Sequence, residues 1–192
     1  MIGTWTLVTP PTDEPVTLTE IKDHLHVSST AEDSLLALYA QMAREAVEAE
    51  TWRAFMPQTW VLYLDAWPAD GIIELPRPPL ASVTSITYTD EDGATQTLAA
   101  NNYRVDTARE PGRVVLAPDG EWPSDALDTS NPIAVTFVAG YADASAVPTM
   151  AKAAILLQTA EIYANREAAI TGTIVAVAPS VQRVINLLRV RW

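Results

Sequence analysis

The chain has 192 residues, of which 48% are hydrophobic, and a formal net charge of -12, enough apolar material for one substantial domain or two small ones. It contains no cysteine, which excludes a disulfide scaffold, a thiol nucleophile and any zinc site with cysteine ligands. The acidic balance argues against a dedicated DNA-binding protein, because phosphate binding needs clustered Lys and Arg.

No apolar run approaches the roughly 20 residues that span a bilayer, and the first residues lack the basic and apolar pattern of a signal peptide. We therefore expect a soluble protein that is intracellular when made and has no membrane partner.

Charge is divided unevenly along the chain. Residues 1–149 hold 22 acidic and 7 basic residues, a net of -15, whereas residues 150–192 hold 2 acidic and 5 basic residues, a net of +3. One interpretation is that basic residues gather near helix C-termini as they ordinarily do. The other is that the basic end docks on an acidic neighbour, such as another copy of the chain.

The first part of the chain predicts an arm and two helices. Residues 1–16 are proline-rich and indicate an extended arm. Thr17 and Glu20 have the spacing of a capping box and predict the start of a short helix. Ser29 and Glu32 repeat that spacing before a helix expected over about 31–51, with apolar residues at helical intervals. These are Leu35, Leu38, Tyr39, Met42, Ala46 and Val47.

The middle of the chain changes to the alternating period of β-strands. We expect a hairpin around the turn at 90–93, where Asp-Glu-Asp-Gly lacks the later acidic ligand of a calcium loop. The other predicted strands lie in 58–67, 71–76, 102–106, 112–117 and 133–141.

The last part of the chain predicts a helix that begins at Pro148, which suits a first-turn position. Its apolar residues cover so much of its girth that it should pack against its own domain and against something else. Residues 170–178 then carry no charge, which indicates either a buried strand or a segment that becomes buried in an assembly. A basic amphipathic helix from Ser180 ends the chain.

These patterns together predict an α+β fold. Residues 1–56 would form an arm and helices, residues 57–147 an inserted, mostly antiparallel β region, and residues 148–192 a helix, an apolar connector and a basic terminal helix. We expect 1–56 and 148–192 to pack together as one helical domain.

The residues indicate no active site. His24 and His26 are two positions apart and would face different directions on a helix, so they cannot share a metal ion. No glycine-rich phosphate loop and no nucleophile elbow is present, and nothing singles out a pair of carboxylates. For Trp52 and Trp60, core packing is the simplest interpretation. We therefore predict no catalytic residue, no cofactor and no metal ligand.

The order of segments resembles the head–tail connector (adaptor) family of long-tailed bacteriophages and related prophage elements, in its longer members with a β insertion. The resemblance covers most of the chain. It rests on LTEIKDHLHV, AEDSLLALYAQMAREAVEAETWRAF, QTWVLYLDAWP, IELPRPPLASVTSITYTDEDG, YRVD, FVAGY, VPTMAKAAILLQTAEIYANRE and INLLRVRW.

The resemblance implies a structural protein without enzymatic activity. Copies would form a twelvefold ring below the portal of the virion, extend the DNA channel and join the head to the neck or tail. The implied partners are other copies, the portal protein and a tail-side neck or stopper protein, and double-stranded DNA would pass without specific binding. Assembly would take place in the cytoplasm of the host bacterium, for a phage or for a gene-transfer element.

A ring built from head-to-tail contacts needs two different surfaces on each subunit. The segment from about 171 to 192 is expected to be a docking element that is completed only by burial against other chains. Portal or subunit docking is assigned to Ile174, Val175, Val177, Arg183, Leu187, Leu188, Arg189, Arg191 and Trp192. Ring contact is assigned to Leu156, Ile162, Tyr163 and Arg166. An acidic ring or channel surface, which would repel DNA phosphates, is assigned to Glu32, Asp33, Glu45 and Glu48.

Three other interpretations stay open from the sequence. The chain could be a tail-completion or stopper protein of the same neck. It could be a small hydrolase, in which case two carboxylates about 5 to 10 Å apart should line one aromatic cleft. It could also be a binding module with a β-sandwich-like body.

Overall fold

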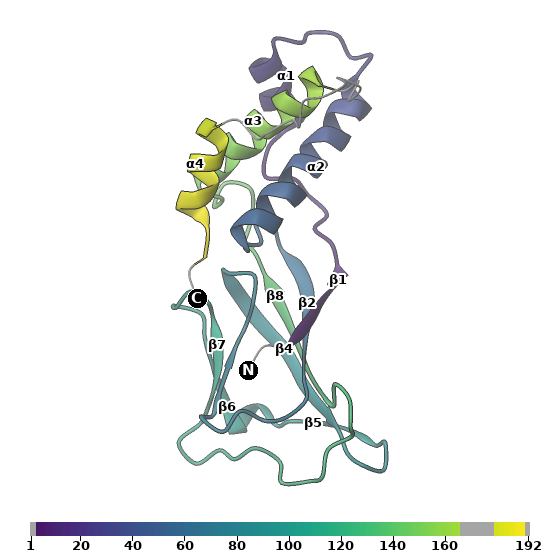
Figure 1. Ribbon diagram of the computed structural model, residues 1–192, viewed down its shortest axis with the longest axis vertical. Helices are drawn as coiled ribbons and strands as arrows, with labels where there is room; N and C mark the ends of the chain where they lie inside the picture. The colour runs from purple at the N-terminus through teal and green to yellow at the C-terminus, as the bar shows by residue number, and fades with distance from the viewer. Residues whose placement is uncertain (1–2, 166–178, 191–192) are drawn as a thin grey trace. The chain divides into compact units, whose positions relative to one another are not determined.

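The computed structural model describes residues 3–165 and 179–190, and its contacts divide the chain into two compact units (Figure 1). The β unit comprises residues 1–11 and 57–142, and the helical unit comprises residues 12–56 and 143–191. Within the described residues there are four α-helices and two antiparallel sheets, which confirms the predicted α+β class.

The first helix of the helical unit, α1 (Leu18–Leu25), begins at the predicted capping box. The Thr17 hydroxyl accepts from the Glu20 backbone N–H at 3.2 Å, and the Glu20 carboxylate accepts from the Thr17 backbone N–H at 2.6 Å. Two of the N–H groups that a helix start leaves without partners are satisfied in this way. The helix ends at His26, whose φ of 56° is left-handed.

The long helix α2 (Asp33–Thr51) starts two residues later than predicted, and the capping box expected at Ser29 and Glu32 is wrong. Glu32 occupies the N-cap without a side-chain cap bond, and the Ser29 hydroxyl accepts from the Ala31 N–H instead. The helix ends at Trp52 in the left-handed conformation. Trp52 is 39% exposed, so its assignment to the core is wrong.

Small side chains let α2 approach α3 (Thr149–Ala164) closely. Ala40 and Ala43 of α2 are buried, as are Ala151 and Ala154 of α3, and the two helices lie in contact. Larger apolar side chains complete this core: Ile21, Leu36, Val47, Phe55 and Ile155 are fully buried.

The last described helix, α4 (Pro179–Leu188), also packs within the helical unit. Val181 and Ile185 are each 1% exposed. Beyond the helix, the Val190 N–H donates to the Thr51 carbonyl at 3.0 Å, and the Arg53 side chain donates to the Leu188 carbonyl at 2.6 Å. These bonds occupy carbonyl groups that a helix end leaves without partners.

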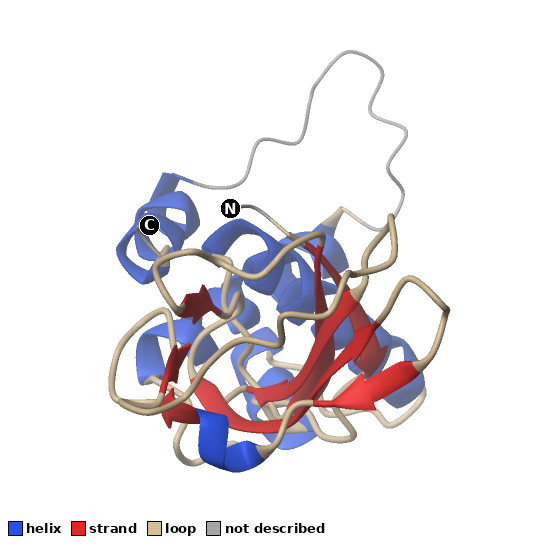
Figure 2. Ribbon diagram, turned by 90° about the horizontal axis from the view of Figure 1, so that it is seen from below, coloured by secondary structure: helices blue, strands red, loops and turns tan. Residues whose placement is uncertain are grey.

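The larger sheet of the β unit has the strand order β1-β2-β8-β4-β5 (Figure 1). Figure 2 shows the strands of the β unit in red. Alternate residues of its central strand β8 are fully buried, and these are Ile133, Val135, Phe137 and Ala139. The strands are β1 (Thr4–Thr9), β2 (Gln58–Leu64), β8 (Ile133–Ala139), β4 (Leu80–Thr89) and β5 (Thr95–Thr97). The pairing of β1 with β2 was not expected, because the proline-rich start of the chain indicates only an extended arm.

The hairpin predicted around residues 90–93 joins β4 to β5. The Asp90 carboxylate accepts from the backbone N–H groups of Asp92 and Ala94, and Gly93 takes a φ of 81°. An aspartate that bonds the backbone of its own turn is typical of such turns.

A smaller sheet has the order β3-β7-β6, formed by β3 (Ile72–Glu74), β7 (Arg113–Leu116) and β6 (Tyr103–Asp106), with a 3-10 turn η1 (Ala100–Asn102) before β6. Beside the sheets, the Trp67 and Trp122 rings stack at 4.7 Å, and the Trp122 indole donates to the Pro68 carbonyl at 3.0 Å. Trp60 is half-buried beneath the Arg77 guanidinium, 5.1 Å from its ring centre. Trp60, Trp67 and Trp122 therefore serve packing within the β unit.

Candidate assembly surfaces

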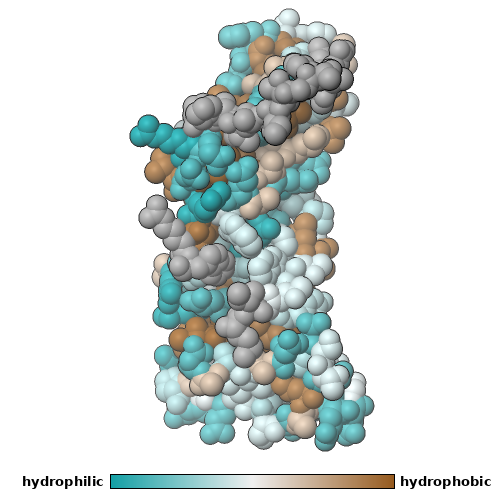
Figure 3. All heavy atoms as spheres, viewed as in Figure 1, coloured by the Kyte–Doolittle hydropathy of each residue, from teal (hydrophilic) through white to brown (hydrophobic). Residues whose placement is uncertain are grey.

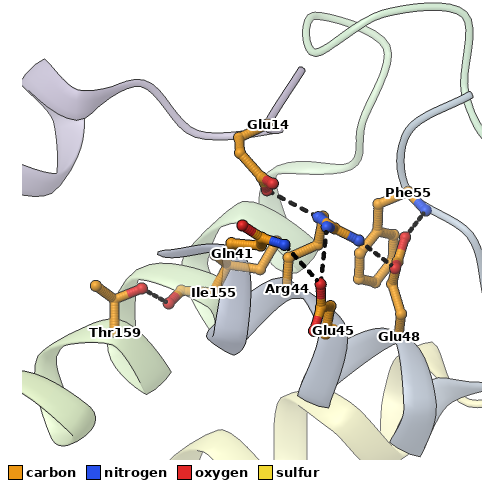
Figure 4. Close-up of polar contacts among 8 residues, drawn as sticks. All are labelled: Glu14, Gln41, Arg44, Glu45, Glu48, Phe55, Ile155 and Thr159. Atoms are coloured by element: carbon orange, nitrogen blue, oxygen red, sulfur yellow. Dashed lines mark hydrogen bonds and ion pairs between the residues drawn. The ribbon is translucent and has the colours of Figure 1, made fainter. Parts of the chain in front are cut away.

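A buried ion network lies on the inner side of α2 (Figure 4). The Arg44 side chain, 4% exposed, donates to the Glu14 carboxylate at 2.8 Å and to the Glu48 carboxylate at 2.7 Å. The other Glu48 oxygen accepts from the Phe55 backbone N–H at 2.6 Å. The network thus ties the segment before α1 and the segment after α2 to the middle of α2.

Burial by itself lowers the pKa of Arg44, but the attraction of Glu48 and the hydrogen bonds and charge of Glu14 outweigh it, and the pKa is raised. The guanidinium therefore stays charged inside the unit. A buried charge of this kind is tolerated only when its partners are in place.

Glu48 is 6% exposed, so its assignment to an acidic surface is wrong. The physical reason is its pairing with Arg44, four residues earlier and on the inner side of the same helix. The i, i+4 spacing of Arg44 and Glu48 is a signal in the sequence that could have indicated this pair.

The other three residues of the predicted acidic surface lie in different surroundings. Asp33 is 2.7 Å from Lys22 of α1 in an ion pair. Glu32 accepts from the Tyr163 hydroxyl at 2.7 Å, so a residue assigned to the acidic surface and one assigned to ring contact are joined within a single subunit. Glu45 is the most exposed of the set, with 57% of its side chain open to solvent, although it lies 3.5 Å from Arg44 and accepts from the Gln41 side chain at 2.9 Å.

The outward side of α2 is mostly apolar, and it includes Leu38, Met42 and Ala46, which belong to the apolar residues predicted at helical intervals. Leu38 is 50% and Met42 is 46% exposed, and Ala46 and Ala49 are exposed on the same side. We call Leu38, Met42, Glu45, Ala46 and Ala49 the α2 outer stripe. A helical step of 100° per residue places this stripe opposite the buried positions of the helix.

The helix α3 also has apolar residues on more than one side. Ala151, Ala154 and Ile155 are buried, and buried Thr159 donates back to the Ile155 carbonyl at 2.7 Å. The predicted ring-contact residues Leu156, Ile162 and Tyr163 are half-buried. Arg166 lies outside the described residues. The large side chains of α3 most open to solvent are Met150 at 42% and Leu157 at 36%.

The packing of the terminal helix α4 contradicts one prediction from the sequence. The end of the chain was expected to be completed only by other chains, but α4 buries Val181 and Ile185 in its own unit, and Arg189 donates to the Glu50 carbonyl at 3.0 Å. The side of α4 opposite Val181 and Ile185 is exposed to solvent. We call Arg183, Asn186 and Leu187, all exposed, the α4 outer face.

Of the residues assigned to docking, the α4 outer face contains Arg183 and Leu187, whereas Leu188 is half-buried and Arg189 is exposed but bonded to its own chain. The others lie outside the described residues, and these are Ile174, Val175, Val177, Arg191 and Trp192.

Figure 3 shows hydrophobic residues interspersed with hydrophilic ones on the face of the molecule that it draws. Within residues 3–165 and 179–190, no group of three or more His, Cys, Asp or Glu side chains is placed to hold a metal ion. Over the same residues, none of the helices has the length and apolarity needed to cross a membrane.

Comparisons with known proteins add three findings. Residues 15–106 match the family model described as Phage gp6-like head-tail connector protein. No curated protein matches the chain. The third finding is that this chain is similar, over almost its full length, to chains in solved structures of gene transfer agent (GTA) particles.

One such structure is a chain in the neck of an empty GTA particle, computed with C6 symmetry, at 26% identity and a TM-score of 0.77 over 98% of this chain and 96% of that chain. Another is a chain in the virion of a native gene transfer agent, at 25% identity and a TM-score of 0.77 over the same shares. A third is a chain in the neck of a native GTA particle, computed with C12 symmetry, at 26% identity and a TM-score of 0.74 over 100% of this chain and 97% of that chain.

Proposed function

Because this chain belongs to the phage head–tail connector family and has the structural role of a connector, we propose that its copies form a twelvefold ring below the portal of a phage or phage-like particle. In this position the ring would extend the DNA channel and join the head to the neck or tail.

The observation that carries the proposal is the likeness to a chain in the GTA neck, which extends over 98% of this chain and includes both the helical and the β unit. The related necks were computed with C12 and with C6 symmetry. Sixfold symmetry is a subgroup of twelvefold symmetry, so both are compatible with twelve copies around one axis. A closed ring of this kind is built from one repeated head-to-tail contact.

The surfaces of the chain support a structural role. The helical unit exposes the mostly apolar α2 outer stripe and the α4 outer face, where Leu187 is 65% exposed beside Arg183 and Asn186. The net charge of -12 would keep DNA phosphates from adhering during passage. No reaction is required for this role, so we propose that the protein is not an enzyme and uses no cofactor.

We further propose that the partners are other copies, the portal protein and a tail-side neck or stopper protein. The side chains assigned to docking include Arg183 and Leu187, which the α4 outer face exposes. Leu156, Ile162 and Tyr163 stay a prediction for ring contact. The protein would be assembled in the host cytoplasm and would reside in the virion neck.

The test is to mix the purified full chain with isolated portal rings and, separately, with the tail-terminator protein of the same particle. Co-sedimentation with the portal and a ring seen below it by electron microscopy are expected. Binding to the tail terminator without binding to the portal would instead identify a stopper. Wild-type protein is the right material, because deletion of the chain end would remove Val181 and Ile185 from the core of the helical unit.

A further inference from the structure

Four residues of the α2 outer stripe outline a hole on the helix surface. Met42, Glu45, Ala46 and Ala49 stand at positions i, i+3, i+4 and i+7, and all four are exposed. In helix packing, four residues at this spacing receive one side chain of a facing helix. Here the small side chains of Ala46 and Ala49 leave room for an inserted side chain, and the longer side chains of Met42 and Glu45 would flank it.

The α4 outer face carries a side chain suited to such a hole. Leu187 is 65% exposed, the highest fraction among the exposed large hydrophobic residues of the described chain. The other side of α4 is already buried through Val181 and Ile185. Leu187 therefore points away from the buried side of its helix, and it presents a large apolar side chain that another copy could cover.

The charges beside these two areas are opposite. Glu45 is the charged residue of the α2 outer stripe. Its carboxylate lies 3.5 Å from the Arg44 guanidinium and accepts from the Gln41 side chain at 2.9 Å, but 57% of its side chain is still exposed and can meet a second cation. Helix α4, over Pro179–Leu188, contains no acidic residue, and Arg183 lies one turn before Leu187 on the same side. Residues four apart on a helix are neighbours, so one contact could bury Leu187 and place Arg183 beside a carboxylate.

The exposed side of α3 is less suitable as the occupant of this hole. It presents Met150 and Leu157, and the charged residue one turn after Leu157 is Glu161. Packing of this side on the α2 outer stripe would bring Glu161 toward Glu45, and like charges in contact are unfavourable. The charges therefore favour α4 over α3 as the helix that packs on the α2 outer stripe.

We propose that, in the ring, Leu187 of one copy inserts between Met42, Ala46 and Ala49 of the next copy, and that Arg183 pairs with Glu45 of that copy. This inference rests on the proposed function. The two areas differ and belong to one subunit, so the contact is head-to-tail and each subunit uses it twice. Contacts of this form make a closed ring when the rotations from copy to copy add up to a full turn.

The absence of cysteine from the chain allows a cross-linking test without background. Ala46→Cys and Leu187→Cys are made in separate full chains, mixed in equal amounts with portal rings and mildly oxidised. Disulfide formation requires Cα atoms within about 7 Å, so a cross-link reports direct contact. We expect linked dimers in the mixture and in neither single variant alone, and a ladder of higher oligomers from the double variant.

Ala37→Cys is the matched control, because Ala37 is exposed on the same helix but lies outside the α2 outer stripe. Its mixture with Leu187→Cys should give several-fold less dimer. A charge exchange provides a second readout: Arg183→Glu and Glu45→Arg should each weaken ring formation, by about tenfold if each contact contributes about 1.4 kcal/mol. The combination of both should recover part of the loss, since the pair between copies is only inverted, whereas Glu45→Arg also removes the 3.5 Å ion pair with Arg44 within its own copy.

The outcomes separate this inference from the proposed function. If rings form on the portal but the Ala46 and Leu187 cysteines link no better than the Ala37 control, this contact is wrong and the connector ring stands. A dimer from Leu187→Cys alone would show a symmetric pairing of α4 and would also overturn the contact. If the wild-type chain neither binds portal nor forms rings, the proposed function fails, and this inference fails with it.

Discussion

Replacement of Arg44 by methionine should be one of the most destabilising single changes in the helical unit. Arg44 is 3% exposed and holds the carboxylates of Glu14 and Glu48. Methionine keeps much of the aliphatic packing, so the effect isolates the loss of the guanidinium. Glu14, with 29% of its side chain exposed, can be solvated by water after the change, but Glu48, at 8%, cannot.

The magnitude follows from the charge left behind on Glu48. Removing one partner of a buried ion pair costs 3–5 kcal/mol. The lower end applies here, because the Glu48 carboxylate still accepts from the Phe55 N–H, and we expect Arg44→Met to lower the free energy of unfolding by about 3 kcal/mol. Addition of Glu48→Gln should recover about 1 to 2 kcal/mol, because a neutral amide carbonyl keeps the Phe55 bond without an unpaired charge.

The assay is urea unfolding of the full chain, followed by far-ultraviolet circular dichroism of the helices, for the wild type, both single variants and the double variant. The reasoning is wrong if Arg44→Met costs less than about 0.5 kcal/mol, the size of an ordinary surface substitution. It is equally wrong if the double variant is less stable than Arg44→Met alone, because the unpaired carboxylate would then not be the source of the loss.

Other predictions concern local features. Thr17→Ala should lower stability by about 1 kcal/mol in thermal or urea unfolding, through loss of the α1 cap. The Thr17 backbone N–H and hydroxyl bonds lower the pKa of Glu20 below its ordinary 4.5. The Glu20 carboxylate therefore stabilises the fold above pH 4.5, and this stabilisation is lost as the pH falls through the folded-state pKa of Glu20. For this reason Glu20→Gln should make the loss of stability in acid measurably less steep. Gly120→Ala should cost about 1–3 kcal/mol, because a Cβ there would lie 2.2 Å from the Asn102 carbonyl oxygen. Trp122→Ala should abolish the near-ultraviolet circular dichroism of the Trp67–Trp122 stack and, because Trp122 is half-buried, cost about 1–2 kcal/mol.

The elements that could be predicted were those with a strong local pattern. The α1 cap was identifiable because Thr17 and Glu20 satisfy each other's backbone groups, a bond set within four residues. The hairpin at 90–93 was identifiable for the same reason, since Asp90 and Gly93 create the turn locally. The alternation of β8 was also local, because strand side chains point to opposite faces in turn.

The features that the sequence did not predict depend on contacts between distant residues. The spacing of Ser29 and Glu32 equals that of the α1 cap, yet Glu32 bonds Tyr163 of α3 instead. The pairing of β1 depends on β2, which is more than 45 residues further along the chain. Neither partner is visible in a local window of sequence.

The α2 outer stripe could not be identified from the sequence, because α2 has two apolar sides. Leu38 and Met42 follow helical spacing as well as Leu36 and Val47 do, and alanines fit either side. Periodicity therefore could not say which set faces the core. The burial of Glu48 could not be predicted for a similar reason, because an acidic residue three positions from exposed Glu45 is more often solvated than paired.

The central claim is that twelve copies of this chain close into a ring on the portal, and cryo-electron microscopy of the neck assembled from full-length chain and portal tests it most directly. The account predicts twelve copies around the channel below the portal, with the symmetry of the native GTA neck computed in C12. A neck in which this chain is absent from the portal-proximal ring, or is present as isolated subunits without contact between neighbours, would contradict the account.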